Sequence, residues 1–142
     1  MTDKLHMTPS QAGRGWKILE LASLAAGLGG SATACLANYN WHWFRESVFY
    51  MCWSAVPFVM MGIGSYFVRR VIGSPVLRPI MAFLAALLAF LSLTAYIPAV
   101  LHPNHSSGMI FAVLPLCWMI GIPAVLTVIT VCFLVVKSWL KR

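Results

Sequence analysis

Three histidines between the hydrophobic stretches of this sequence have side chains suited to metal binding. His42 lies in an aromatic segment, and His102 and His105 lie together in a later segment. Three imidazole groups can hold a zinc or copper ion. However, the spacing of His102 and His105 across Pro103 matches no established metal motif, and such residues also anchor loops at a membrane surface. We therefore name His42, His102 and His105 as candidate metal ligands, with surface anchoring as the competing interpretation.

Other catalytic and cofactor chemistry lacks the residues that it needs. A nucleophile at Ser106 would require a base and an orienting acid. His105 is adjacent, but Glu46 is the only acid expected nearby. A four-helix membrane cytochrome holds haem through histidines inside its helices, whereas all four histidines here lie outside the hydrophobic stretches. We expect neither an enzyme nor a cofactor.

The cysteines leave one question open. Cys35 and Cys52 should lie beneath the same membrane surface, so either a disulfide between them or two free thiols fits the sequence. There is no Cys-x-x-Cys pair, which disfavours a thiol-oxidising enzyme. Small residues before Cys35 loosely match a secretory cleavage site, but the apolar run continues beyond it and favours a retained helix.

Glu20 is the one acidic residue in a hydrophobic stretch. A carboxylate inside the membrane is a candidate for proton coupling. Glu20, however, falls within one turn of the expected cytoplasmic interface and three residues after Lys17. We expect the two charges to neutralise each other at the membrane surface.

The composition excludes a water-soluble globular protein. Of 142 residues, 61% are hydrophobic and 9% are charged, against roughly 45–50% and about 25% in soluble domains. Four apolar stretches, at 18–37, 48–68, 79–101 and 109–136, have the length of about 20 residues that crosses a bilayer. Short connections make neighbouring helices antiparallel. The sequence predicts an all-α integral membrane protein, an antiparallel up-down four-helix bundle. Its single transmembrane domain, 18–136, lies between an N-terminal segment, 1–17, and a basic tail, 137–142.

The distribution of basic residues predicts the orientation of the bundle. Nine of the ten Lys and Arg residues lie in the N-terminal segment, in the connection between the second and third stretches, or in the tail. Arg45 alone lies on the other side, next to Glu46. Because basic residues mark the cytoplasmic side, we expect both termini in the cytoplasm (N-in/C-in) and the chain in the inner (plasma) membrane. Contact with anionic lipid headgroups then accounts for the net charge of +7, and no nucleic acid is needed.

Aromatic residues predict the same two membrane surfaces. At the inner surface we expect Trp16, Tyr66 and Trp139. At or near the outer surface we expect Tyr39, Trp41, Trp43, Tyr50 and Tyr96.

Small residues predict which helix faces pack together, because they let helix backbones approach closely in lipid. In the first stretch one column of small residues is Ala22, Ala26, Gly30 and Ala34, and the adjacent column is Ser23, Gly27, Ser31 and Cys35. In the third stretch the stripe is Ala82, Ala85, Ala89 and Ser92. We expect the first and third helices to be packing partners within the chain, with a dimer face as the alternative for the first.

The prolines inside the second and fourth predicted helices are Pro57, Pro115 and Pro123. Each removes a backbone hydrogen bond and is a candidate kink. Scattered Ser and Thr hydroxyls form no polar row that could line a pore, and they can bond to their own helix backbones.

These features favour a non-enzymatic membrane protein that packs against a membrane-protein partner, as an accessory subunit, assembly factor or immunity-type protein. One alternative is a small homo-oligomeric transporter or channel for an ion or small solute, with Pro123 at its moving element. The other alternative is an outer-face metal handler that uses His42, His102 and His105.

Overall fold

The computed structural model describes residues 9–37, 44–101 and 107–140, and within these ranges it contains four helices and no strand. The helices are α1 (Pro9–Ala37), α2 (Phe44–Ile72), α3 (Leu77–Leu101) and α4 (Ser107–Trp139). All four are long and apolar enough to cross a membrane. The predictions of an all-α chain and of four helices long and apolar enough to cross a membrane are therefore confirmed.

The helices extend beyond the predicted apolar stretches. α1 begins at Pro9 rather than near residue 18, and α2 runs from Phe44 to Ile72 rather than from 48 to 68. Hydropathy detects only the part of a helix that suits hydrocarbon, whereas the backbone hydrogen bonds continue into polar residues at each end. Much of the predicted N-terminal segment is thus part of α1.

A glycine ends α2 and turns the chain into α3. Gly73 has a φ of 67°, and its amide donates to the carbonyl oxygen of Arg69 over 3.0 Å. This is the left-handed cap that favours glycine, because a side chain there would meet the backbone. Arg69 and Arg70 lie in the last turn of α2, where positive charge interacts favourably with the helix dipole. The turn thereby gathers basic residues at one end of the bundle.

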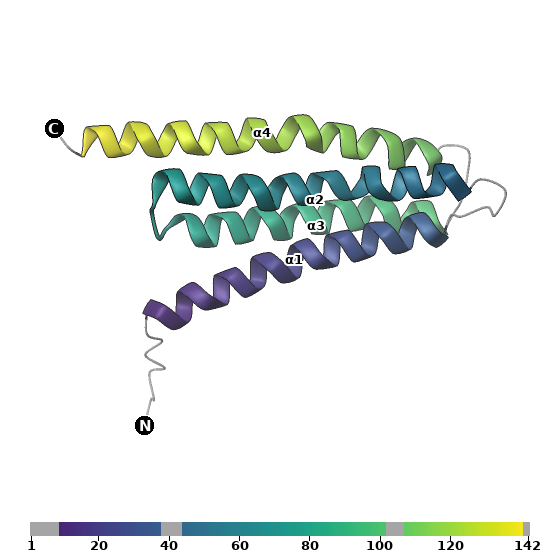
Figure 1. Ribbon diagram of the computed structural model, residues 1–142, viewed down its shortest axis with the longest axis horizontal. Helices are drawn as coiled ribbons and strands as arrows, with labels where there is room; N and C mark the ends of the chain where they lie inside the picture. The colour runs from purple at the N-terminus through teal and green to yellow at the C-terminus, as the bar shows by residue number, and fades with distance from the viewer. Residues whose placement is uncertain (1–8, 38–43, 102–106, 141–142) are drawn as a thin grey trace, which may run out of the picture.

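Successive helices run in opposite directions, and the start of α1 and the end of α4 lie at the same end of the bundle (Figure 1). The most extensive interfaces are nevertheless between α1 and α3 and between α2 and α4, which run in the same direction. α1 also packs on α2, whereas α3 makes smaller interfaces with α2 and α4. The predicted partnership of the first and third helices is confirmed.

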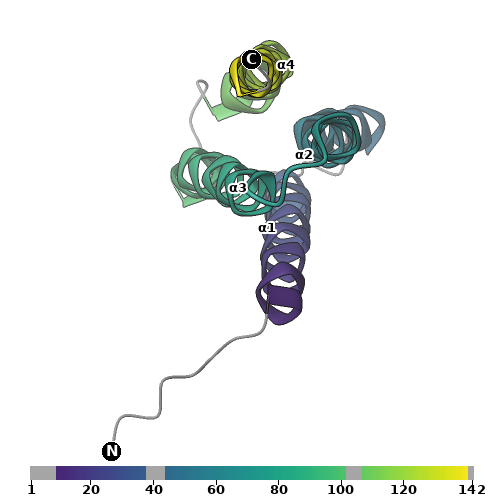
Figure 2. The same ribbon diagram turned by 90° about the vertical axis from the view of Figure 1, so that its left-hand side faces the viewer.

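The helices do not form an evenly packed square. Seen end-on, α1 and α4 lie on opposite sides of α2 and α3 (Figure 2). The first turns of α1 lean away from the other helices at the end where α2 joins α3 (Figure 1). This divergence leaves space between α1 and the α2–α3 turn.

Two clusters of apolar side chains fill the bundle. The larger joins all four helices and includes Leu24, Phe58, Met81 and Leu126. The smaller lies toward the end of the bundle where α3 ends and α4 begins. It includes Tyr96, which stacks on Phe111 with ring centroids 4.9 Å apart and 4° between the ring planes. Tyr96 is 2% exposed, so it belongs to the core rather than to the outer aromatic surface that we predicted. Its ring stays inside because the small residues of α1 and α3 leave room for it.

Small residues of α1 do bring the helices together, but mainly through the second of the two predicted columns. A Cβ atom added to Gly27 would overlap the ring of Phe58 on α2, and one added to Gly30 would overlap Leu93 on α3. Ser31 is fully buried, whereas Ala22 and Ala26 are exposed. α1 is thus rotated so that Glu20, Gly27 and Ser31 face the bundle.

Candidate functional site

The predicted site residues fall into three groups in the structure. The candidate metal ligands His42, His102 and His105 lie outside the described residues. The small residues of α3, which are Ala82, Ala85 and Ala89, are buried, and so is Ala34 on α1. Pro57 and Pro115 are buried, Pro123 is exposed, and the helices continue through all three.

The cysteines are free thiols in this structure. Cys35 is buried and its Sγ lies 3.6 Å from Ser54 Oγ, while Cys52, Cys117 and Cys132 are exposed on the outside of the bundle. The structure therefore contains no disulfide between Cys35 and Cys52.

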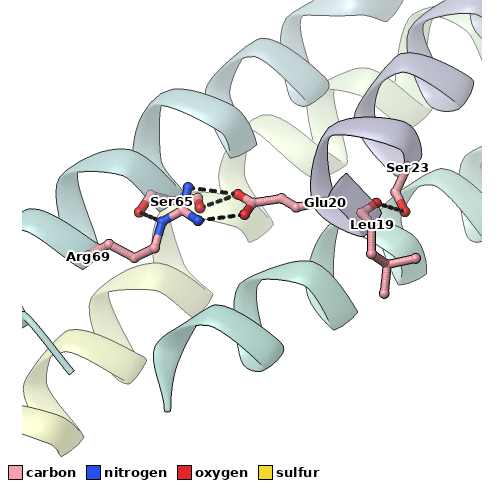
Figure 3. A network of polar contacts seen from close by, with 5 residues as sticks. All are labelled: Leu19, Glu20, Ser23, Ser65 and Arg69. Atoms are coloured by element: carbon pink, nitrogen blue, oxygen red, sulfur yellow. Dashed lines mark hydrogen bonds and ion pairs between the residues drawn. The ribbon is translucent and has the colours of Figure 1, made fainter. Parts of the chain in front are cut away.

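A buried polar cluster links α1 to α2, and we call Glu20, Ser65 and Arg69 the Glu20 cluster (Figure 3). The guanidinium of Arg69 binds the Glu20 carboxylate through two bonds, Nη1 to Oε2 at 2.7 Å and Nη2 to Oε1 at 3.1 Å. The hydroxyl of Ser65 donates to Oε1 of the same carboxylate. The side chain of Glu20 is only 4% exposed and that of Arg69 is 26% exposed.

This arrangement corrects the expected pairing of Glu20 with Lys17. Glu20 is buried rather than at the surface, and its cationic partner is Arg69, which lies 49 residues away in the sequence. A planar guanidinium matches a carboxylate with two parallel hydrogen bonds, and this makes the pair both stronger and more directional than a lysine contact. A carboxylate held in this way is a structural link between two helices.

A basic cavity of about 430 Å³ adjoins the Glu20 cluster. Lys17 of α1, Arg69 and Arg70 of α2, and Arg78 of α3 supply its charge, and the other lining residues are Tyr66, Gly73, Ser74 and Pro75. Arg78 reaches across to α1, since a Cβ atom on Gly13 would overlap its guanidinium. The cavity therefore lies where α1 diverges from the turn between α2 and α3. Basic residues from three separate helices therefore line the same cavity.

An apolar groove of about 140 Å³ lies between α3 and α4. It is lined by Met61, Leu84, Leu87, Leu88, Trp118, Gly121, Ile122, Val125 and Leu126. The indole nitrogen of Trp118 is buried and has no hydrogen-bond acceptor among the described residues. By contrast, the indole of Trp53 on α2 donates to the carbonyl of Ala112 on α4 over 3.0 Å. A hydrogen bond from an indole thus joins α2 to α4. The indole that lines the groove between α3 and α4 has no acceptor among the described residues.

Most of the intramembrane hydroxyl groups use their single donor hydrogen within their own helix. Ser23, Ser31, Thr33, Thr94 and Thr130 each donate to a carbonyl three or four residues earlier in their own helix. The prediction that these hydroxyls bond to their own helices is confirmed.

The sequence contained a signal for part of these sites. Glu20, Arg69, Arg70 and Arg78 stood out as charges near apolar stretches. Trp118 did not stand out, because an indole in an apolar helix is unremarkable until its surroundings are known.

Comparison with protein-family models, with curated proteins and with solved structures finds no match for this chain.

Proposed function

We propose that this protein is a non-enzymatic accessory, assembly or immunity-type protein of the inner membrane, which binds a helix of a membrane-protein partner in the groove between α3 and α4. Both termini lie in the cytoplasm. The convergence of Lys17, Arg69, Arg70 and Arg78 at one end of the bundle supports this orientation, because positive charge accumulates on the cytoplasmic side.

The indole of Trp118, which has no acceptor in the part of the chain that the structure describes, is the observation that carries the proposal. A buried donor without an acceptor costs about 1–3 kcal/mol, and no water is present in the bilayer core to offset that cost. Lipid tails have no acceptor to offer. A partner helix in the groove would pack against Trp118, which lines it, and can offer a hydroxyl or carbonyl oxygen there.

The shape of the groove supports a helix as its occupant. Its walls are almost wholly apolar, and Gly121 lowers one wall, since a Cβ atom there would meet only Trp118, at 4.0 Å. A small residue at such a place lets a second helix approach closely, as helix association in lipid requires. Leu87 on the opposite wall is 40% exposed and is available for contact.

The proposal is tested by filling the groove without disturbing the bundle. Gly121→Leu projects a side chain into the groove, whereas the matched control Gly29→Leu adds the same side chain on an open face of α1, where a Cβ atom meets nothing within 4 Å. Native mass spectrometry of the protein in lipid discs from its own membrane measures which chains remain bound. We expect a stoichiometric partner with the wild type and Gly29→Leu, and its loss with Gly121→Leu.

A photo-crosslinker locates the contact directly. Placed at Leu87 it should capture the same partner, and placed at the exposed Leu21 of α1 it should not. Two results would contradict the proposal: a partner retained by Gly121→Leu, or a particle that contains only copies of this chain. The second result would favour the homo-oligomeric transporter, to be followed by flux measurements in liposomes.

A further inference from the structure

The basic cavity at the α2–α3 turn has an excess of positive charge that none of the described residues neutralises. Its lining includes four cationic side chains and no Asp or Glu. Glu20 neutralises one of the four, Arg69, so the other three contribute the net positive charge of the cavity lining. Like charges gathered around a cavity repel one another unless an anion lies between them.

The Glu20 cluster holds Arg69 in place with donors to spare. A guanidinium has five N–H groups. Three of them are used, by the two bonds to Glu20 and by the bond from Nε to the carbonyl of Ser65 at 3.2 Å. Two N–H groups remain on a side chain whose position is already set, so little conformational entropy is lost when an anion binds.

Other donors complete the cavity. Arg70 donates to the phenol oxygen of Tyr66 over 3.4 Å, which leaves the phenol hydrogen free to point elsewhere. Ser74 adds a hydroxyl, and Arg78 is held over Gly13 on α1. Guanidinium groups that surround a small space match the tetrahedral oxygens of a phosphate better than a single planar carboxylate.

The surroundings of the cavity suit a lipid. A second cavity, of about 410 Å³, shares Gly73 and Ser74 as a common wall and is lined mainly by apolar residues: Ile72, Phe133, Val136 and Leu140, with Lys137 beside them. Phe67 and Val71 add exposed apolar side chains to the last turns of α2. A polar cavity next to an apolar one, at the end of a membrane helix, matches a headgroup with its attached chains.

We propose that the basic cavity binds the phosphate group of an anionic phospholipid, with Arg69, Arg70, Arg78 and Lys17 as its ligands. This site is separate from the groove between α3 and α4 and does not depend on the function proposed for that groove. A bound lipid would also bridge the diverging start of α1 to the α2–α3 turn. Free phosphate has the same chemistry, and the experiment distinguishes the two sources.

The test compares two double variants that remove equal charge. Arg70→Gln with Arg78→Gln removes two exposed cavity arginines. The control Arg14→Gln with Arg45→Gln removes the exposed Arg14, which lines neither cavity, and Arg45 in the first turn of α2, at the opposite end of the bundle. Each purified protein is titrated with phosphatidylglycerol, with phosphatidylcholine and with inorganic phosphate, and native mass spectrometry counts the bound molecules. Arg14, Arg70 and Arg78 are exposed rather than part of the buried core, and circular dichroism checks that all three proteins are folded.

We expect the wild type and the control to retain one phosphatidylglycerol more tightly than phosphatidylcholine. The cavity variant should bind phosphatidylglycerol roughly 30-fold more weakly, as expected for two basic residues worth about 1 kcal/mol each at an anionic surface. Millimolar phosphate should not displace the lipid. If phosphate binds alone and excludes the lipid, the source is free phosphate and the lipid assignment is wrong. An equal loss in both double variants, or none in either, would overturn the site altogether.

Discussion

The side chains of Glu20 and Arg69 show how a charge is accommodated below the membrane surface. Their two hydrogen bonds, with the third from Ser65, satisfy a carboxylate that is otherwise hidden from solvent. Such a pair contributes little net stability, because desolvation offsets the attraction between the charges. Removing one partner is different, since it leaves the other charge uncompensated.

We therefore predict that Glu20→Gln destabilises the bundle by about 3 kcal/mol, because Arg69 loses its counter-ion. Combining Glu20→Gln with Arg69→Met should restore most of that loss. Lys17→Gln is the matched control and should change stability by less than about 1 kcal/mol, as for an exposed charge. Unfolding in mixed micelles of increasing SDS content measures all four proteins. A large effect of Lys17→Gln would mean that the sequence-based pairing was right and the structural one wrong.

α1 packs through glycines on one of its faces, whereas the opposite face leaves open space at Gly29. Gly27 and Gly29 are two residues apart and differ in this respect: a Cβ atom on Gly27 would overlap Phe58, and one on Gly29 would meet nothing within 4 Å. The close approach of α1 to α2 depends on the absence of that atom.

This difference predicts opposite effects for the same substitution. Gly27→Ala should destabilise the bundle by roughly 1–3 kcal/mol through overpacking, and Phe58→Leu should relieve part of the cost. Gly29→Ala should stabilise it by up to about 1 kcal/mol, because alanine is the better helix former. The same SDS unfolding measurement applies. Equal effects at the two glycines would show that α1 is rotated differently.

The bundle as a whole has a polar asymmetry between its two ends. The α2–α3 turn, with Arg69, Arg70 and Arg78 around it, lies at the same end as the last turns of α4 (Figure 1). The last turn of α3, which ends at Leu101, lies at the opposite end of the bundle (Figure 1). If positive charge sets the orientation, the first end faces the cytoplasm.

Single cysteines in a variant without the native thiols test that orientation. A membrane-impermeant maleimide added to intact spheroplasts should label Leu101→Cys at the end of α3. It should label Ser74→Cys and Ser138→Cys only after the membrane is permeabilised. Leu101 and Ser138 lie at the ends of α3 and α4, Ser74 lies in the turn between α2 and α3, and none of the three is in the buried core. The reverse pattern would place both termini outside.

The four helices and their approximate positions were determined by the sequence itself. Hydrophobic length and backbone hydrogen bonding are local properties, so an apolar run of about 20 residues implies a membrane helix whatever it packs against. The small-residue stripe of α3 followed from the same local reasoning, and Ala82, Ala85 and Ala89 are indeed buried.

Only the tertiary structure decided which residues face one another. Glu20 has Lys17 beside it in the sequence, yet its partner is Arg69, because α1 is rotated toward α2 and the guanidinium fits the carboxylate through two bonds. The same rotation exposes Ala22 and Ala26 and buries Ser31. Rotation about a helix axis depends on the summed fit of many side chains from other helices, and no single stretch of sequence contains that information. The basic cavity and the unpaired indole of Trp118 are consequences of that packing.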